Sequence, residues 1–194
     1  MHKGRLEAFS DAVIAILMTI MVLELRAPEG ADLNALRPLV PVFLTYLLSF
    51  VNLGIYWNNH HHLLQAADRV NGSVLWANLH LLLWLSLFPF ATQWMGENHL
   101  ASTPTAFYGV VSLLAAIAYF ALQTVVVSEH GADSAMATAL GRDLKGKLSP
   151  LLYGAGIAVA FVSTWIAISL YVVVALMWLI PDRRMAPVAR ETGP

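Results

Sequence analysis

Six apolar stretches separated by short polar segments form the dominant pattern along the chain. A helix that crosses a bilayer needs about 20 mostly apolar residues. The pattern predicts transmembrane helices at approximately 5–25, 38–64, 73–95, 104–127, 148–162 and 165–180. Residues 128–147 are predicted to form a connection between helices, and 182–194 a terminal tail. No segment remains for a second domain, so we expect an all-α integral membrane protein with one six-helix domain over 1–194.

The first predicted helix combines a polar beginning with an apolar body. Arg5, Ser10 and Asp11 lie in its first half, and residues 12–23 are apolar except for Thr19. A charged side chain near the centre of a membrane helix costs about 2.5–3.5 kcal/mol even on mild scales. Asp11 is therefore expected to find polar partners on other helices.

The same helix carries a narrow apolar stripe. At about 100° per residue, Ala12, Ile16, Thr19 and Leu23 share one side, and Asp11 points about 110° away from it. One interpretation is that the stripe packs on a neighbouring helix. The other is that it lines a narrow pore when several copies surround an axis.

Polar residues on three helices are predicted to lie at matching depth. Ser10 and Asp11 begin the first helix, a run from Asn58 to His62 ends the second, and the third begins with Asn78 and His80. Polar groups in lipid must bond to one another or to water. We expect these residues to clamp the three helices together, and a proton relay or gate is the alternative.

The three consecutive histidines also suggest a metal site. His60, His61 and His62 point about 100° apart on a regular helix, so they cannot all bind one ion without a ligand such as His80 or Asp11. No resident metal is therefore predicted.

Composition supports the membrane assignment and excludes several functions. The chain has 194 residues, of which 58% are hydrophobic and 12% charged, whereas soluble domains carry about 25% charged residues. The net charge of −1 gives no reason to expect nucleic-acid binding. Cysteine is absent, and no nucleophile with an evident base or glycine-rich phosphate loop is found. We therefore expect neither an enzyme nor a cofactor.

The distribution of basic residues predicts the orientation. With six spans both termini lie on one side, and that side carries nine of the 11 Lys and Arg residues. Loops rich in Lys and Arg remain cytoplasmic. A multi-pass protein of the cell membrane with both termini in the cytoplasm is expected.

Several motifs resemble a known channel family. The first helix opens with Arg5-x-x-x-Phe9-Ser10-Asp11, which is similar to the signature of the lysosomal-type potassium channels (transmembrane protein 175) and their prokaryotic relatives. The likeness continues with Trp57-x-x-His60-His61, Asn78, Leu87-Phe88-Pro89-Phe90, Tyr119 and the closing run from Trp178 to Arg184. The resemblance therefore covers nearly the whole chain.

The resemblance implies a homotetramer in which the first helices surround a potassium-permeable pore without a standard filter loop. A bulky apolar residue then forms the constriction, with a threonine one turn further on. On this sequence these residues are Ile16 and Thr19, with Leu23 and Ala12 on the same stripe, and potassium passes near Thr19 as the permeant ion.

The predicted polar network around this pore helix includes more residues than those expected to clamp the three helices together. It comprises Arg5, Phe9, Ser10, Asp11, Trp57, His60, His61, Asn78 and His80. Partners are then other copies of the chain, the lipid bilayer and potassium ions.

Two other functional classes remain open at this point. A proton-coupled secondary transporter would use Asp11 and His60–His62, but it would be expected to show inverted repeats and helices broken at mid-membrane. Neither feature is evident, since Pro89, which is expected to kink the third helix, lies toward that helix's end. A non-conducting membrane scaffold is the third possibility.

Overall fold

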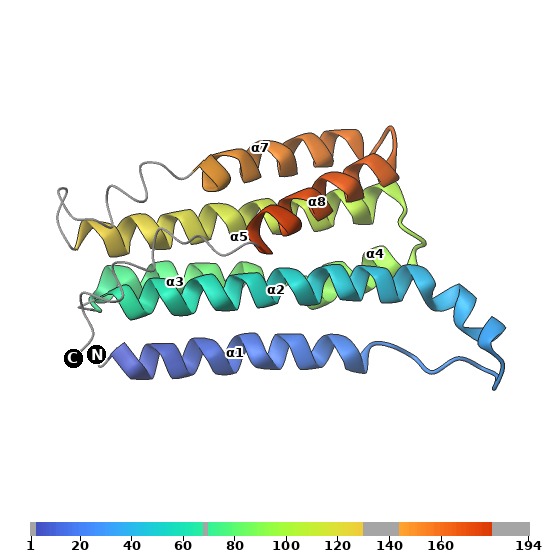
Figure 1. Ribbon diagram of the computed structural model, residues 1–194, viewed down its shortest axis with the longest axis horizontal. Coiled ribbons are helices and arrows are strands. Elements are labelled where there is room, and N and C mark those ends of the chain that lie inside the picture. The colour runs from blue at the N-terminus through green and yellow to red at the C-terminus, as the bar shows by residue number, and fades with distance from the viewer. Residues whose placement is uncertain (1–2, 68–69, 130–143, 180–194) are drawn as a thin grey trace.

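The computed structural model describes residues 3–67, 70–129 and 144–179, and Figure 1 shows their arrangement. These residues form α-helices, the 3-10 helix η1 and their connections, with no strand among them. The elements in chain order are α1 (Lys3–Leu23), η1 (Leu33–Leu39), α2 (Val40–Ala66), α3 (Gly72–Leu85), α4 (Phe88–Glu97), α5 (Ser102–Ser128), α7 (Leu144–Val159) and α8 (Thr164–Leu179). The expected all-α class is confirmed.

Within the described ranges, four stretches are long and apolar enough to cross a membrane. They are Lys3–Leu23, Leu33–Ala66, Gly72–Glu97 and Ser102–Ser128. The other two of the six expected helices, α7 and α8, have 16 described residues each. At 1.5 Å per residue each reaches about 24 Å, which is less than a hydrocarbon core of about 30 Å.

Some predicted boundaries fall outside the described residues. Most of the connection expected at 128–147 and the whole tail expected at 182–194 lie there. Within the described part, α7 begins at Leu144, four residues before the expected start of the fifth helix.

The third span is broken rather than bent, with 14 residues before the break and 10 after it. α3 ends at Leu85 and α4 begins at Phe88, with Pro89 in the first turn of α4. Proline has no N–H group and clashes inside a helix, but it fits the first turn, where that group has no helical partner. A new helix therefore begins at Phe88, one residue before this proline, where a kink was expected.

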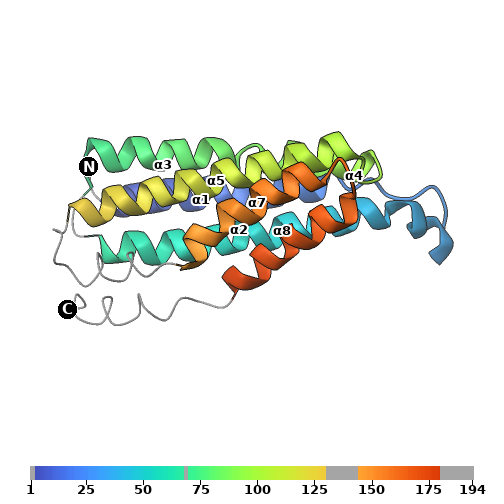
Figure 2. The ribbon, with the colours of Figure 1, turned by 90° about the horizontal axis from the view of Figure 1, so that it is seen from above.

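The helix α1 forms one edge of the bundle. It packs against α2, α3 and α4, while α5, α7 and α8 pack together on the other side of those helices. Figures 1 and 2 show this arrangement, and in Figure 1 one long side of α1 is uncovered. We call the end where α1 begins and α2 ends the inner end.

One buried tyrosine fixes the helical hairpin of α7 and α8 against α5. Tyr171 on α8 is fully buried, and its hydroxyl donates to the Thr105 carbonyl oxygen at 3.3 Å. Its ring occupies notches at Gly109 of α5 and Gly156 of α7, where an added Cβ would clash with the ring. Glycine at these two positions is therefore what allows the three helices to approach so closely.

Candidate functional site

The two sides of α1 differ sharply in burial. Its buried residues are Leu6, Ser10, Ile14, Leu17 and Met21. The predicted stripe of Ala12, Ile16, Thr19 and Leu23 is exposed along its whole length. Ile16 is 54% exposed and Leu23 80%, so the rest of the chain leaves the stripe uncovered.

The stripe lies nearly opposite the anchored side of the helix. At about 100° per residue, the centre of the stripe is roughly 150° from the centre of the buried side. One side of α1 is therefore committed to its own chain. The other side presents an apolar surface with Thr19 as its hydroxyl-bearing member.

The hydroxyl of Thr19 has a defined orientation. It donates to the Ile16 carbonyl oxygen at 2.9 Å, one turn back on the same helix. Since the hydrogen is used in that bond, the oxygen lone pairs remain available to accept. Hydroxyl oxygens in this state can replace part of the hydration shell of a cation.

A buried hydrogen-bonded chain joins α1 to its neighbours. Asn78 Nδ2 of α3 donates to Ser10 Oγ of α1 at 3.0 Å, and Asn78 Oδ1 lies 2.7 Å from His60 Nε2 of α2. All three side chains are at most 1% exposed. The amide oxygen is an acceptor only, so His60 Nε2 carries the hydrogen. This chain fixes the rotation of α1 against α2 and α3.

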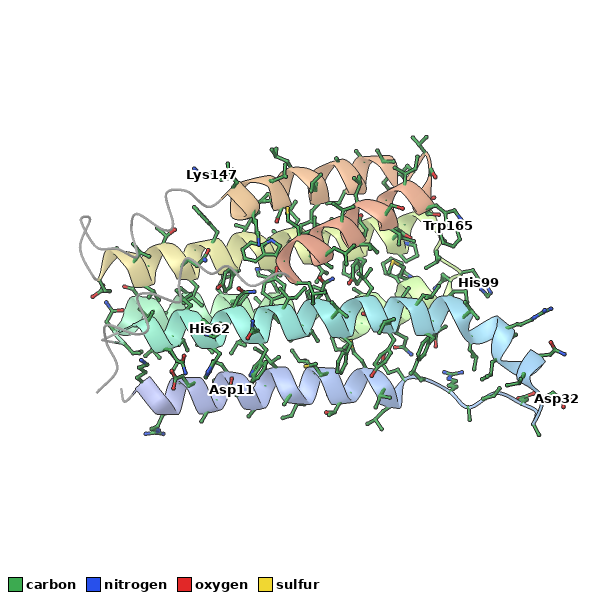
Figure 3. All side chains as sticks on the ribbon, in the orientation of Figure 1. Asp11, Asp32, His62, His99, Lys147 and Trp165 are labelled. Carbon is green, nitrogen blue, oxygen red and sulfur yellow. The ribbon has the colours of Figure 1, made fainter. Side chains whose placement is uncertain are left out.

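Asp11 makes a second, more exposed link between α1 and α2. Trp57 Nε1 donates to Asp11 Oδ1 at 3.0 Å. His61 stacks on Trp57, with ring centroids 6.1 Å apart and planes inclined by 19°. Figure 3 shows Asp11 and His62 near the inner end, so this link lies toward the same end as the buried chain.

Other residues of the predicted network lie outside both links. Arg5 and Phe9 are exposed and make no hydrogen bond or ion pair among the described residues. His80 accepts a hydrogen bond from Trp84 Nε1 of its own helix at 2.9 Å. No group of three His, Cys, Asp or Glu in the described part of the chain is placed to hold a metal ion.

Sequence reasoning missed a second buried polar cluster, deeper in the bundle. Asn52 Nδ2 donates to the Tyr108 hydroxyl at 3.0 Å, and Ser49 Oγ lies 3.1 Å from that hydroxyl and 2.6 Å from Thr92 Oγ1. Thr92 Oγ1 is also 3.9 Å from Met21 Sδ of α1. Isolated Ser, Thr and Tyr in apolar helices give a weak signal, because each of them also occurs where it bonds only to its own helix.

Two acidic residues lie near each other at the end of the bundle opposite the inner end: Glu24, just after α1, and Glu97, the last residue of α4. Burial and the nearby Glu97 carboxylate raise the pKa of Glu24, which follows α1 in the chain. Arg26 lies 4.0 Å from Glu97, at the limit of an ion pair. The charge at this end is therefore only partly compensated.

Comparisons with known proteins find relatives of this chain. The family described as the endosomal/lysosomal potassium channel TMEM175 matches residues 5–89, which contain most of α1 and the hydrogen-bonded residues Ser10, His60 and Asn78. A potassium channel of Chryseobacterium sp. (strain P1-3) is 52% identical over 191 residues, covering 98% of this chain and 100% of the relative. The chain belongs to the TMEM175 family.

Further relatives are similar over nearly their full length. A potassium channel of Streptomyces collinus is 29% identical over 190 residues, with 91% of each chain covered. The crystal structure of a lysosomal potassium-selective channel TMEM175 homolog from Chamaesiphon minutus superposes with a TM-score of 0.81 at 26% identity, covering 92% of this chain and 96% of that one. Membership of a channel family confirms the expectation that the protein is not an enzyme.

Proposed function

We propose that the protein is a potassium-permeable channel in which α1 helices from four copies surround the pore. Potassium as the permeant ion is supported by the names of the bacterial relatives and of the superposed structure. The passage is passive and needs no cofactor.

The observation that carries the assignment of the pore is the uncovered stripe on α1. A helix at the edge of a membrane bundle can present any apolar side to lipid. Here, however, the buried hydrogen bond from Asn78 to Ser10 fixes the rotation of the helix and turns Ile16 and Thr19 away from the chain's own core. A fixed rotation of this kind is what a helix needs if its far side is to meet copies of itself.

The proposed constriction combines an apolar ring with a hydroxyl ring. Four Ile16 side chains around an axis can close the pore by dewetting, without any charge. Thr19 lies three residues further on, a rise of about 4.5 Å, and four such oxygens can partly replace the hydration shell of potassium. Hydroxyls alone give modest selectivity compared with stacked carbonyl rings.

The polar links act as supports for this pore helix. The hydrogen bonds of Asn78 to Ser10 and His60 hold α1 to α2 and α3. The hydrogen bond from Trp57 to Asp11 resists rotation of α1 about its axis. We assign Asp11 a positioning role rather than a place in the permeation path.

The protein is multi-pass, and we propose that its inner end faces the cytoplasm. Helix α1 begins and helix α5 ends at the inner end. The predicted distribution of Lys and Arg favours a cytoplasmic location for this end. Glu24 and Glu97 then lie at the external side of the pore helix.

The decisive experiment is potassium flux from liposomes that contain the purified protein. Ile16→Asn is expected to wet the constriction and to increase flux or reduce selectivity. Ile166→Asn on α8 is the matched control, because Ile166 is 53% exposed against 54% for Ile16. Equal flux in the two variants would remove Ile16 from the gate.

The same vesicles separate the channel from a proton-coupled transporter. A channel gives fast flux that continues when no proton gradient is present. Slow flux that requires a proton gradient, and that stops in an Asp11→Asn variant, would instead support the transporter.

A further inference from the structure

A crevice inside the single subunit lies apart from the stripe on α1. It has a volume of about 40 Å³ and is enclosed by α2, α5, α7 and α8. Its walls include Asn52 and Asn59 of α2, Gln123 of α5, and Tyr153 of α7. Gly146 and Ser149, near the start of α7, form part of its wall, and the labelled Lys147 marks that part of α7 in Figure 3.

The crevice carries polar atoms to mid-membrane depth. Asn52 is 14 residues from the end of α2, which corresponds to about 21 Å of helix. A hydrocarbon core is about 30 Å thick, so polar atoms at this depth need partners other than bulk water. Polar groups buried in a membrane bundle are stable only when bonded to protein or to trapped water.

Several polar atoms on the walls have no partner among the residues that the structure describes. Tyr153 is 3% exposed, and its hydroxyl makes no hydrogen bond to any residue that the structure describes. The Tyr56 hydroxyl on the same wall also makes no hydrogen bond to a described residue. Asn59 uses its Nδ2 to donate to the Ile55 carbonyl oxygen at 2.8 Å, and within the described ranges nothing donates to its Oδ1.

The size and chemistry of the crevice select its occupant. A water molecule needs about 10–15 Å³ of such volume, so the crevice has room for about three. An apolar cavity that binds benzene is much larger, about 150 Å³. Among the residues that the structure describes, the side chains that form the walls include no Asp, Glu, Lys, Arg or His, so a small uncharged hydrogen-bonding molecule fits these side chains better than an ion.

The crevice is connected to α1 by the deep polar cluster. Asn52 forms part of its wall and donates to Tyr108, which is joined through Ser49 to Thr92, and Thr92 lies against Met21 of α1. A change in the crevice can therefore alter the packing of the pore helix through hydrogen-bonded side chains.

We propose that each subunit holds a water-filled crevice that admits small uncharged molecules from the inner end, and that its occupancy is transmitted to α1 through the cluster from Asn52 to Thr92. The crevice itself is independent of the proposed potassium channel function. Its effect on flux rests on that function.

Cysteine labelling tests the crevice directly, because the natural chain has no cysteine. Three neighbouring residues of α5 have different surroundings: Ala115 is fully buried, Ala116 borders the crevice, and Ile117 is 45% exposed on the outer surface. Each is changed to Cys and treated with methyl methanethiosulfonate in proteoliposomes. Only a thiol in contact with water ionises and reacts readily.

Ala116→Cys is expected to react at least about tenfold faster than the other two variants, since tight packing or lipid suppresses their thiolate. Ala116 is 12 residues from the end of α5, about 18 Å of helix, so contact with the aqueous surface does not explain such a rate. Equal rates for all three variants would overturn the crevice.

Potassium flux tests the connection to α1. Modification of Ala116→Cys is expected to change flux by about two- to tenfold, the range that corresponds to one hydrogen bond of ordinary strength. The same modification in a Thr92→Val background should leave flux unchanged. Rapid labelling without any change in flux would overturn the connection. An absence of flux from every variant, including the unmodified protein, would instead count against the channel function.

Discussion

Replacing Asn78 with leucine tests whether the buried hydrogen bonds from Asn78 to Ser10 and His60 set the rotation of α1. Leucine has nearly the same size but neither donor nor acceptor, so the substitution removes both bonds, at 3.0 Å to Ser10 and 2.7 Å to His60. Asn78 and Ser10 are 0% exposed and His60 is 1% exposed, so water cannot replace the lost partners.

The expected cost can be estimated from these two bonds. Hydrogen bonds between membrane helices contribute about 0.6 kcal/mol on average and about 1.7 at most. Two such bonds give roughly 1–3 kcal/mol of lost stability. In a soluble protein the orphaned partners would cost up to about 3 kcal/mol each, but the membrane-unfolded state also finds partners, and the lower range is therefore used.

The assay is unfolding of the purified protein by titration with sodium dodecyl sulfate, followed by the fluorescence of its six tryptophans. His80→Leu is the control, because His80 is exposed and bonds only to Trp84 of its own helix. Its expected effect is within about 0.5 kcal/mol. If Asn78→Leu is as stable as the natural protein, or if His80→Leu costs more, the buried chain does not anchor α1.

Three further outcomes are expected from single changes. Gly109→Ala should destabilise the fold by about 1–3 kcal/mol, because its Cβ would collide with the buried tyrosine ring, whereas Gly54→Ala, with open space around it, should be neutral or stabilising in the same unfolding assay. Burial and a neighbouring carboxylate raise the pKa of Glu24, so the stability of the protein should be greatest at pH values below the ordinary carboxyl pKa and should fall as the pH rises through the raised pKa. Thermal melts of Glu24→Gln between about pH 4 and 7 should lack this fall in stability. If the pH profile of the variant equals that of the natural protein, Glu24 is not the titrating group. Thr19→Val should reduce the preference for potassium over sodium, measured from reversal potentials in bilayers. Thr124→Val is the control and should not reduce it, because it removes a similar hydrogen bond, of 2.8 Å, to its own helix. Equal ratios of potassium to sodium permeability in the two variants would remove the hydroxyl ring from the mechanism.

The stripe on α1 was within reach of sequence because it depends on helical period alone. Ile16 and Thr19 share one side of any regular helix, and the structure leaves that side exposed. The partner of Ser10 was partly within reach, since Asn78 and His60 were expected at the same depth. Their pairing in a single chain depends on how α2 and α3 are rotated, and no local pattern determines that rotation.

Other predictions depended on packing and could not be made from local sequence. His80 was expected in the network but bonds to Trp84, four residues away on its own helix. Tyr108 lies in a predicted helix without any charged neighbour, and its role in the deep cluster follows only from the crossing of α2, α4 and α5.

The sequence by itself determined that the chain is a helical membrane protein and which side of α1 carries the apolar stripe, because hydropathy and helical period act over a few neighbouring residues. The tertiary structure decided which polar side chains meet, where the third span breaks into two helices, and where a crevice opens between α2, α5, α7 and α8. These features depend on the relative rotation and depth of helices far apart in the chain, and that geometry is set by the packing of all of them together.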